Sequence, residues 1–478
     1  MPAMEPVIGL EIHSQLKTAT KLFCSCSTSV GEEPNSHICE VCSGQPGALP
    51  RINATAVELA AKAGLALGCR VNEVSLFSRK NYFYPDLPSG FQTSQLEPPI
   101  CENGGLEVGE GSAARYIRLN RIHMEDDAGK CIHDDQRGQS LVDLNRAGTP
   151  LIEIVTEPDF RSAEEVVEFL KKLHAILVSL EVTNGRLEEG EFRCDVNISL
   201  RPQGTETLGV RSEIKNLNSF RHVSQAIEYE IMRQGRLYAE NLPLSQETRL
   251  FDPGKQETRA LRSKEEAHDY RYFPQPDLPA VVVSPELLAR LKEEMPELPE
   301  AVAGRLSELG LTEEQVAVLL NRKRAVEYFD AAVKILNDPK RVATLMVELL
   351  LPACQRDDIS PADGDCKVPP ASLAKLGRLM ADDTLSRRAA YDLFPELFDK
   401  GGEPEEMARA AGKLQVSDTG AISAMAQEVI DEHPAEAQKY REGQEKILSF
   451  FVGQLMRRSK GAANPKMAGD ILARLLKG

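Results

Sequence analysis

The sequence predicts an α+β protein in which a large mixed domain is followed by helices. Up to residue 295 the chain contains short alternating apolar runs separated by Gly and Pro, a pattern that indicates strands and turns. Beyond residue 298 the apolar residues recur at helical spacing. We therefore predict three domains, at residues 1–295, 296–405 and 406–478.

Strands in the first domain are predicted from runs in which apolar and polar residues alternate. The runs are VIGLEIH, RYIRLNRIHM, LVDLN, PLIEIV, RCDVNISL and PAVVV, at residues 7–13, 115–124, 141–145, 150–155, 193–200 and 279–283. Between them, residues 163–180 and 223–232 have the apolar spacing of helices. This mixture of strands and helices is what predicts the α+β class.

The second half of the chain has helical patterns that are interrupted by two breaks. Apolar residues at helical spacing occur at Val316, Leu319, Leu320, Val326, Phe329, Val333 and Leu336, and again at Ile447, Leu448, Phe451 and Leu455. The breaks are the Pro- and Asp-rich segment 352–370 and the Gly-Gly-Glu-Pro segment 401–404. We expect a helical domain and then a small helical tail that ends in an amphipathic helix.

Composition and charge limit the classes of function. No apolar run approaches the about 20 residues that a membrane span needs, and the N-terminus lacks the basic and apolar segments of a signal peptide. We therefore expect a cytoplasmic protein without membrane contact. The net charge of −16 argues against non-specific nucleic-acid binding over the whole surface. Residues 452–478, however, contain six basic residues and one acidic residue, a local charge of +5.

Four of the ten cysteines form two close pairs. Cys24-x-Cys26 is followed, after twelve residues, by Cys39-x-x-Cys42. Two short thiolate pairs are a typical ligand set for a tetrahedral, structural Zn²⁺ site, and disulfides are not expected in a cytoplasmic chain. His37 is an alternative ligand, and a cluster of reduced cysteines without metal is the other interpretation. The other six cysteines lack such spacing and are expected to be buried apolar side chains.

Carboxylates and imidazoles interrupt three of the predicted strands. Because side chains alternate along a strand, Glu11 and His13 share the face opposite the apolar one, and His123 and Glu125 share a face in the same way. Glu153 lies within the apolar run PLIEIV, where an unpaired carboxylate is costly to bury. A hard cation such as Mg²⁺ would offset that cost. A surface strand with ordinary ion pairs is the alternative, since the sequence does not show whether the three strands meet.

Eight motifs are spread over the chain from residue 9 to residue 465. They are GLEIHSQL (9–16), KNYFYPDLPSGFQTSQ (80–95), RIHMEDDAGK (121–130), SLVDLNRAGTPLIEIVTEPD (140–159), RCDVNISLRP (193–202), RSEIKNLNSF (211–220), RSKEEAHDYRYFPQPDLP (262–279) and GQLMRRSKGAANP (453–465). In this order they resemble the GatB family, which supplies one subunit of the Asp/Glu-tRNA(Asn/Gln) amidotransferases. The resemblance implies a cradle-shaped catalytic domain, a helical domain and a small YqeY-like tail. The chain lacks the long insertion of the archaeal GatE relatives, which favours the bacterial type.

The resemblance implies an ATP-dependent ligase that converts Glu-tRNA(Gln) or Asp-tRNA(Asn) to the amide. A carboxylate is a poor electrophile, so ATP would first convert it to an acyl phosphate, a reaction that depends on positioning and charge neutralisation. Carried over by motif, Glu11, His13, Glu125 and Glu153 would hold Mg²⁺ between the nucleotide and the substrate. The cysteine quartet matches those family members that keep zinc.

Contacts with ATP cannot be located by a standard motif, because the chain has neither a P-loop nor a kinase signature. Candidates for contacts with the nucleotide or the tRNA acceptor end are Lys80, Tyr82, Arg193, Asp195, Asn197, Glu213 and Lys215, each of which is otherwise an ordinary ion-pair or turn residue. The chain also lacks an amidase signature. The resemblance therefore implies that a GatA partner hydrolyses glutamine and that GatC tethers the two proteins in a heterotrimer.

The basic end of the chain is the candidate for binding the tRNA body. Its candidate residues are Arg457, Arg458, Lys460 and Lys466. Basic residues also suit a helix C-terminus, so capping and a solvated face are the alternative interpretation. Two alternatives of a different class are a metal-dependent hydrolase and a zinc-stabilised tRNA-binding protein without catalysis. The sequence does not decide between Glu-tRNA(Gln) and Asp-tRNA(Asn).

Overall fold

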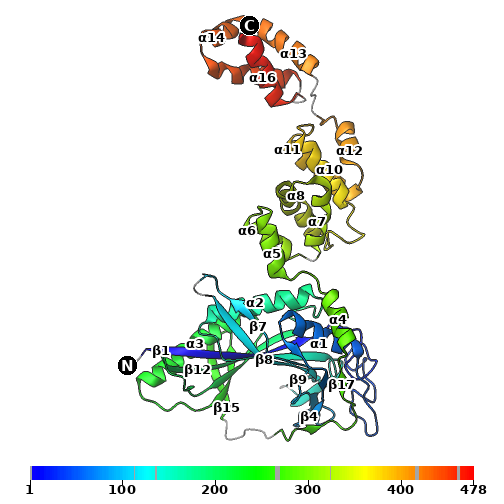
Figure 1. The fold of residues 1–478 in the computed structure, drawn as a ribbon, viewed down its shortest axis with the longest axis vertical. Helices are drawn as coiled ribbons and strands as arrows, with labels where there is room; N and C mark the ends of the chain where they lie inside the picture. Colours follow the sequence, from blue (N-terminus) through cyan, green and yellow to red (C-terminus); the bar gives the residue numbers. More distant parts are fainter. Residues whose placement is uncertain are drawn as a thin grey trace. The chain divides into compact units, whose positions relative to one another are not determined.

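The structure, a computed structural model, describes residues 3–111, 114–134, 137–263, 270–322, 324–414, 419–459 and 463–477. It divides into two compact units, Met1–Leu298 and Pro299–Gly478. The first unit contains a large mixed sheet with helices, and the second is built from helices, so the α+β class is confirmed (Figure 1). No described helix is both long and apolar enough to cross a membrane. The cradle shape of the first domain stays a prediction.

One large sheet organises the first unit, and it has ten strands among the described residues. From edge to edge they are β15 (Glu257–Ser263), β14 (Glu247–Asp252), β13 (Ser212–Leu217), β12 (Phe192–Pro202), β1 (Met4–Gln15), β11 (Pro150–Thr156), β8 (Arg115–Asp126), β6 (Cys101–Glu102) and β2 (Arg70–Val71), with β7 (Gly105–Val108) paired to β8. Neighbouring strands are antiparallel except β13 and β14, which are parallel. β1 therefore has β12 on one side and β11 on the other.

Three smaller sheets belong to the described part of the same unit. In the first, β4 (Ser78–Asn81) lies between β5 (Phe91–Ser94) and β16 (Phe273–Pro274). The other two are the pairs β9 (Lys130–Asp134) with β10 (Gln139–Asp143), and β3 (Val74–Ser75) with β17 (Val281–Val282). The run PAVVV thus forms a strand of only two residues, because its partner β3 is equally short.

The apolar face of the large sheet packs against helices. On β1, Ile8, Leu10 and Ile12 are buried in the core, whereas Glu11 and His13 on the opposite face are partly exposed. The helices of this unit are α1 (Ala54–Ala66), α2 (Ala163–Ser179), α3 (Phe220–Ala239) and α4 (Pro285–Glu293) (Figure 1). Their apolar side chains share one hydrophobic core with the sheet. The polar face is the one that carries the glutamates and histidines.

The second unit is built around two separate hydrophobic cores. The first core contains side chains from Val302 to Ala408, and the second contains side chains from Ile422 to Leu476. The helices in order are α5 (Pro299–Glu308), α6 (Glu313–Leu320), α7 (Ala325–Leu336), α8 (Pro339–Leu345), the π-helix η3 (Met346–Leu350), α9 (Leu351–Arg356), α10 (Pro370–Ala381), α11 (Arg387–Lys400), α12 (Pro404–Ala410), α13 (Thr419–Glu432), α14 (Pro434–Arg441), the 3₁₀ helix η4 (Glu445–Ile447), α15 (Leu448–Arg458) and α16 (Pro465–Lys477). The predicted boundary at residue 405 falls inside α12, and its exact position stays a prediction.

Caps explain where several helices begin. The helix expected at residues 163–180 is α2, and Ser162 accepts a hydrogen bond from its first turn. The helix expected at 223–232 is longer at both ends, and Ser219 caps it in the same way. The expectation that the tail ends in the amphipathic helix around Phe451 is wrong, because a further helix, α16, follows. Asn464 caps it by accepting hydrogen bonds from two backbone N–H groups of its first turn.

Candidate active site and cysteine cluster

A histidine–glutamate–histidine row crosses three strands of the large sheet. In its register, His13 on β1 lies opposite Glu153 on β11, which in turn lies opposite His123 on β8. Directly opposite residues share a face, so their side chains can meet. The Nε2 atoms of His13 and His123 are each 3.3 Å from Glu153 Oε2. The row therefore lies on the polar face of the sheet.

Glu125 joins this row, and together they form what we call the His–Glu cluster. Its carboxylate oxygens lie 3.1 Å from His123 Nε2 and 4.0 Å from His13 Nε2. Two side chains of β5 hold it, because Gln92 Nε2 and Ser94 Oγ donate hydrogen bonds to its two oxygens at 3.0 and 2.7 Å. Glu125 is only 1% exposed. Its position is thus fixed by three hydrogen-bonding partners.

The buried groups of the His–Glu cluster shift one another's pKa. Burial disfavours the ionised form of Glu153, but His123 and His13 outweigh it and hold the pKa of this carboxyl well below its usual range. Burial also opposes a charged imidazole, yet Glu153 and Glu125 raise the pKa of His123 to about 9. The carboxylates therefore keep their charge although they are buried, as binding of a cation requires.

Lys80 and Tyr82 lie beside the His–Glu cluster. Lys80 Nζ lies 5.3 Å from the centre of the Tyr270 ring. Burial opposes its charge, but the nearby Glu125 carboxylate outweighs this effect and the pKa of Lys80 is raised. Tyr82 Oη donates a hydrogen bond at 3.5 Å to Gln92, the residue that holds Glu125. Both predicted contact residues are thus next to the cluster.

Glu11 belongs to a second polar group, between β1 and the strands beyond it. The carboxylates of Glu11, Asp195 and Glu213 offer ligand atoms that all lie within 4.8 Å of one another. Lys215 Nζ bridges two of them, at 2.7 Å from Asp195 and 3.0 Å from Glu213. Asn197 Nδ2 donates to Glu11 Oε1 at 3.1 Å. We call these five side chains the carboxylate–lysine cluster.

The four predicted Mg²⁺ ligands are therefore divided between two neighbouring groups. His13, Glu125 and Glu153 offer ligand atoms within 4.8 Å of one another, and Glu11 faces β12. The division follows from the register, since β1 pairs with a different strand on each side. Burial, followed by the charges of Glu153 and Glu213, raises the pKa of Glu11. Carboxylate oxygens are the ligands that Mg²⁺ prefers, so the residues present fit such a cation.

The ion pairs of Arg193 lie away from both clusters. Its guanidinium donates to Asp127 Oδ1 at 3.1 Å, and the same carboxylate accepts a hydrogen bond from Gln15 at 2.9 Å. Arg146 lies 3.6 Å from it. These contacts support the interpretation of Arg193 as an ion-pair residue that ties β12 to the end of β8.

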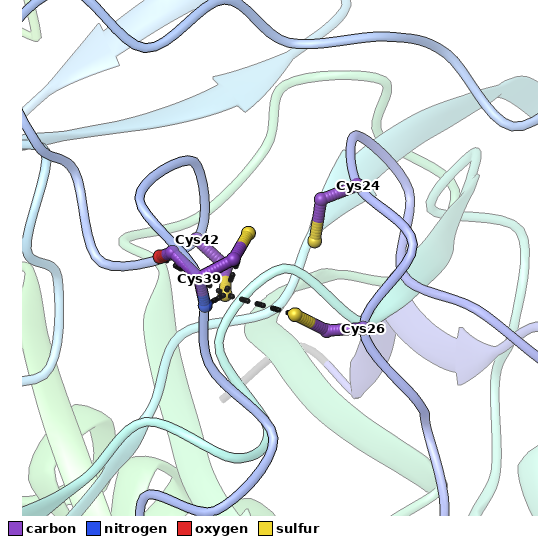
Figure 2. Close-up of side chains that lie close together, drawn as sticks. All are labelled: Cys24, Cys26, Cys39 and Cys42. Atoms are coloured by element: carbon purple, nitrogen blue, oxygen red, sulfur yellow. Dashed lines mark hydrogen bonds between the residues drawn. The ribbon is translucent and has the colours of Figure 1, made fainter.

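Four cysteine side chains converge from two loops that precede α1 (Figure 2). The sulfur atoms of Cys24, Cys26, Cys39 and Cys42 lie within 4.8 Å of one another. Cys42 Sγ is 4.0 Å from the sulfur of Cys26 and 3.9 Å from that of Cys39. A tetrahedron with Zn–S bonds of about 2.3 Å places its sulfurs about 3.8 Å apart. The group therefore has the dimensions of a Zn²⁺ site, and we call residues 24–42 the cysteine knuckle.

The knuckle already favours a thiolate, the form that binds metals. A hydrogen bond from Cys24 lowers the pKa of Cys42 to about 4, although burial opposes the shift. The backbone N–H of Cys39 also donates to Cys42 Sγ, at 3.2 Å. The alternative ligand, His37, places Nδ1 3.5 Å from Ser29 Oγ and is not part of the group of ligand atoms. The structure thus favours the four-cysteine set.

The loop that packs against the end of the knuckle leads to the His–Glu cluster. Gly44, two residues beyond Cys42, has φ +68°, and a Cβ there would lie 2.9 Å from backbone atoms of Pro88 and Ser89. Glycine satisfies both the backbone conformation and the close approach. The segment it contacts continues into β5, which supplies the two side chains that hold Glu125. The knuckle therefore supports the loop that precedes part of the candidate site.

Comparison with known proteins identifies the family. The model described as the GatB/GatE catalytic domain matches residues 6–289, and the model described as the GatB domain matches residues 327–476. The chain belongs to the GatB family. The resemblance predicted from the eight motifs is therefore confirmed.

Relatives of this GatB chain match it over its whole length. The GatB subunit of the aspartyl/glutamyl-tRNA(Asn/Gln) amidotransferase from Nitratidesulfovibrio vulgaris (strain DP4) is 51% identical over 474 residues, or 99% of both chains. The protein of the same name from Solidesulfovibrio magneticus is 50% identical over 477 residues, or 100% of both chains. That of Geobacter sp. (strain M21) is 48% identical over 475 residues, or 99% of both chains.

Three side chains of the GatB site are not among the metal ligands and contact residues predicted from the sequence. His123 does carry a signal, because it shares a strand face with Glu125 and contacts two carboxylates. Gln92 and Ser94 carry none. They lie on a strand of a different sheet, and their contact with Glu125 depends on how two sheets pack.

The predicted tRNA-binding residues of the GatB tail have different surroundings. Arg458 forms ion pairs with two glutamates of α13, at 2.7 and 2.8 Å. Arg457 and Lys466 are exposed. Lys460 lies outside the described residues, as do residues 264–269 of the RSKEEAHDYRYFPQPDLP motif. The contacts of Arg458 agree with capping and bundle stability, whereas the exposed pair is accessible to a ligand.

Proposed function

We propose that the chain is the component of a tRNA-dependent amidotransferase that activates and amidates the amino acid of Glu-tRNA(Gln) or Asp-tRNA(Asn). Relatives at about half identity over the full length are named as GatB subunits of the aspartyl/glutamyl-tRNA(Asn/Gln) amidotransferase. That full-length likeness is the observation that carries the proposal. The two polar clusters on one face of the sheet support it, because phosphoryl transfer to a carboxylate needs concentrated, positioned charge.

The reaction has two chemical steps. The γ-phosphoryl group of ATP moves to a side-chain carboxylate oxygen of the tRNA-bound Glu or Asp, and ADP leaves. The lone pair of ammonia then attacks the acyl carbon, the carbon–oxygen bond to the phosphate breaks, and inorganic phosphate leaves. The nitrogen loses one proton. The protein contributes position and charge neutralisation to both steps.

The residues of the two clusters have separate tasks in this proposal. His13, Glu125 and Glu153 hold Mg²⁺, and Glu11 is a further ligand from the neighbouring cluster. When bound, the cation neutralises charge on the transferred phosphoryl group. Gln92 and Ser94 keep Glu125 in place, which agrees with their hydrogen bonds at 3.0 and 2.7 Å.

Two lysines are suited to contact the anionic groups. Lys215 lies between the carboxylates of Asp195 and Glu213, and a phosphate can compete for its ammonium. Lys80 and Tyr82 lie beside Glu125 and are suited to the acceptor end or its aminoacyl group. Asn197 completes this set as a hydrogen-bond donor next to Glu11.

Partners complete the activity. We expect a GatA partner to release ammonia from glutamine and a GatC partner to tether the two, because the chain lacks an amidase signature. The four knuckle cysteines hold one structural Zn²⁺, with no open position for chemistry. ATP, Mg²⁺ and Zn²⁺ are thus the cofactors of the proposed enzyme.

The proposal is tested by amide formation on each purified misacylated tRNA, with GatA and GatC present. The variants are His13→Ala, Glu125→Gln and Glu153→Gln. Amide formation should fall by at least about 100-fold, including when ammonium replaces glutamine as the nitrogen source. Glutamine hydrolysis by GatA should persist.

The matched control is Glu157→Gln, just beyond β11, whose carboxylate accepts a hydrogen bond from Asn120 outside the cluster. It should retain amide formation. Near-normal activity in two of the three site variants, with folding unchanged, would remove the site assignment. Absence of amide formation by the wild-type complex on both tRNAs would contradict the function itself.

A further inference from the structure

Lys21 is a lysine that the fold buries completely. Its side chain is 0% exposed and is among the largest fully buried side chains of the described residues. A charged ammonium is almost never fully buried unless an opposite charge compensates it. The hydrogen-bond partners of Lys21, however, are two backbone carbonyls and a cysteine sulfur. A counter-charge is therefore required next to Lys21.

The contacts of Lys21 place its ammonium against the cysteine knuckle. Nζ donates to the carbonyl of His37 at 2.8 Å and to that of Leu144 at 3.2 Å. It also forms a hydrogen bond with the side chain of Cys42. The first carbonyl belongs to the knuckle itself. The ammonium is thus in direct contact with one of the four sulfur ligands.

We propose that Lys21 is the counter-charge of the zinc site, a positioning residue that holds the metal-bound Cys42 thiolate. Zn²⁺ with four thiolates carries a formal charge of −2, and a buried ammonium beside it offsets part of that charge. The metal site and the lysine then explain each other: the dianion compensates Lys21, and Lys21 donates to a sulfur. Hydrogen bonds from outside the ligand set orient metal ligands and tune their affinity.

The local backbone supports this arrangement. Gly148 has φ +86°, and a Cβ there would lie 3.4 Å from Lys21 Cδ and 3.5 Å from Cys42 Cβ. The backbone carbonyl of Gly148 also accepts a hydrogen bond from Leu22 N at 2.8 Å. The segment that contains Leu144 and Gly148 thus passes directly over the lysine and the sulfur.

The same contacts connect the knuckle to the candidate active site. The segment that Lys21 contacts leads into β11, the strand that carries Glu153. Lys21 itself follows the end of β1, the strand that carries Glu11 and His13. One ammonium therefore joins the knuckle to two of the strands that form the clusters. Loss of zinc would leave this charge without compensation at their ends.

The first test measures Zn²⁺ affinity of the purified full-length protein by competition with a chelator. Lys21→Met should weaken binding about 10–100-fold, the usual effect of removing an outer partner of a metal ligand. Lys21→Arg, which keeps the charge, should lose less. The matched control is Lys17→Met, four residues earlier, whose ammonium forms an exposed ion pair with Glu181. It should bind Zn²⁺ as the wild type does.

A second readout separates this role from a purely structural one. In the Co²⁺-loaded protein, the sulfur-to-cobalt charge-transfer band should move to lower energy in Lys21→Met, because the sulfur loses a hydrogen-bond donor. The loss of thermal stability caused by Lys21→Met should be large with zinc bound and small or reversed after the zinc is stripped. If Lys21 only pinned two carbonyls, the loss would be the same in both states.

The outcomes distinguish this inference from the zinc assignment on which it rests. A wild-type protein that contains no Zn²⁺ would contradict the metal site. A zinc-loaded wild type with unchanged affinity and unchanged cobalt spectrum in Lys21→Met would overturn the role of Lys21 alone. Lys21→Gln provides the same comparisons if the methionine variant does not fold, since it keeps a donor and removes the charge.

Discussion

His123 lies between two carboxylates and offsets their mutual repulsion. Its Nε2 is 3.1 Å from Glu125 and 3.3 Å from Glu153, and its side chain is buried. Removing one partner from a buried charged group costs about 3–5 kcal/mol, because the remaining charge is uncompensated. A divalent cation at the same carboxylates would supply the missing positive charge.

We therefore expect His123→Ala to destabilise the protein by about 3 kcal/mol without divalent cations, and by clearly less with Mg²⁺. Urea unfolding of the full-length chain in EDTA and in Mg²⁺ measures the difference. The control is His174→Ala, since His174 Nε2 bonds the backbone carbonyl of Gly185 at 2.8 Å, away from the cluster. An equal loss with and without Mg²⁺ would mean that His123 does not share the charge of a cation site.

Strand alternation explains how much of this site is visible in the sequence. It places Glu11 and His13 on one face of β1, as the structure also has them. It does not give the neighbours, and these decide the grouping. His13 meets Glu153 of β11, whereas Glu11 lies opposite Asp195 of β12. Register and strand order come from contacts distant in sequence, so a single sequence does not contain them.

At the scale of elements, the cysteine knuckle and the loop before β5 form one packed pair. Their contact depends on Gly44, where a side chain would meet backbone atoms at 2.9 Å. Backbone atoms do not yield as a flexible side chain does, so the loop itself would have to move. Such a movement would reach Gln92 and Ser94, and through them Glu125.

We expect Gly44→Ala to lower stability by about 2–4 kcal/mol, through both a left-handed backbone and a steric clash. The matched control is Gly47→Ala. Gly47 has φ +87°, but a Cβ added there would have no atom within 4 Å. Its variant should show the backbone cost alone. Thermal unfolding of both variants gives the packing term by difference, and equal losses would contradict the proposed contact.

Helix positions are the more predictable features because their signals are local. Serine caps and apolar spacing lie within a few residues, which is why α2 begins at the expected residue. The tail helix α16 begins at Pro465, directly after Asn464, and these residues also resemble a stop signal for the helix before them. Start and stop signals overlap in such a short linker, so only one of the two helices could be predicted.

At the scale of the whole molecule, charge is unevenly distributed. The chain has a net charge of −16, whereas residues 452–478 have a charge of +5. An acidic surface repels the tRNA backbone, so a basic segment selects where that backbone can lie. The second core of the helical unit, from Ile422 to Leu476, contains this segment and does not share the buried residues of the first core.

We expect removal of the tail to raise KM for the misacylated tRNA and to leave zinc content and glutamine hydrolysis in the complex unchanged. The structure places the best cut after Leu414, because Ala408 of α12 is buried in the first core and a cut at residue 406 would damage it. An unchanged KM for tRNA in steady-state amide formation would reduce the tail to a structural appendage.

Single charge reversals in α15 then test whether the tail acts by charge. Arg457 is exposed, and Arg458 is paired with two glutamates of α13 at 2.7 and 2.8 Å. Arg457→Glu should therefore weaken tRNA binding and lower the slope of log K against log salt by about one, with little change in stability. Arg458→Glu should mainly destabilise the tail, because it places a third carboxylate beside the two glutamates. Binding titrations at several salt concentrations, with thermal unfolding of each variant, separate the two effects. If the Arg457 variant keeps the wild-type salt dependence, that side chain does not contact the tRNA backbone.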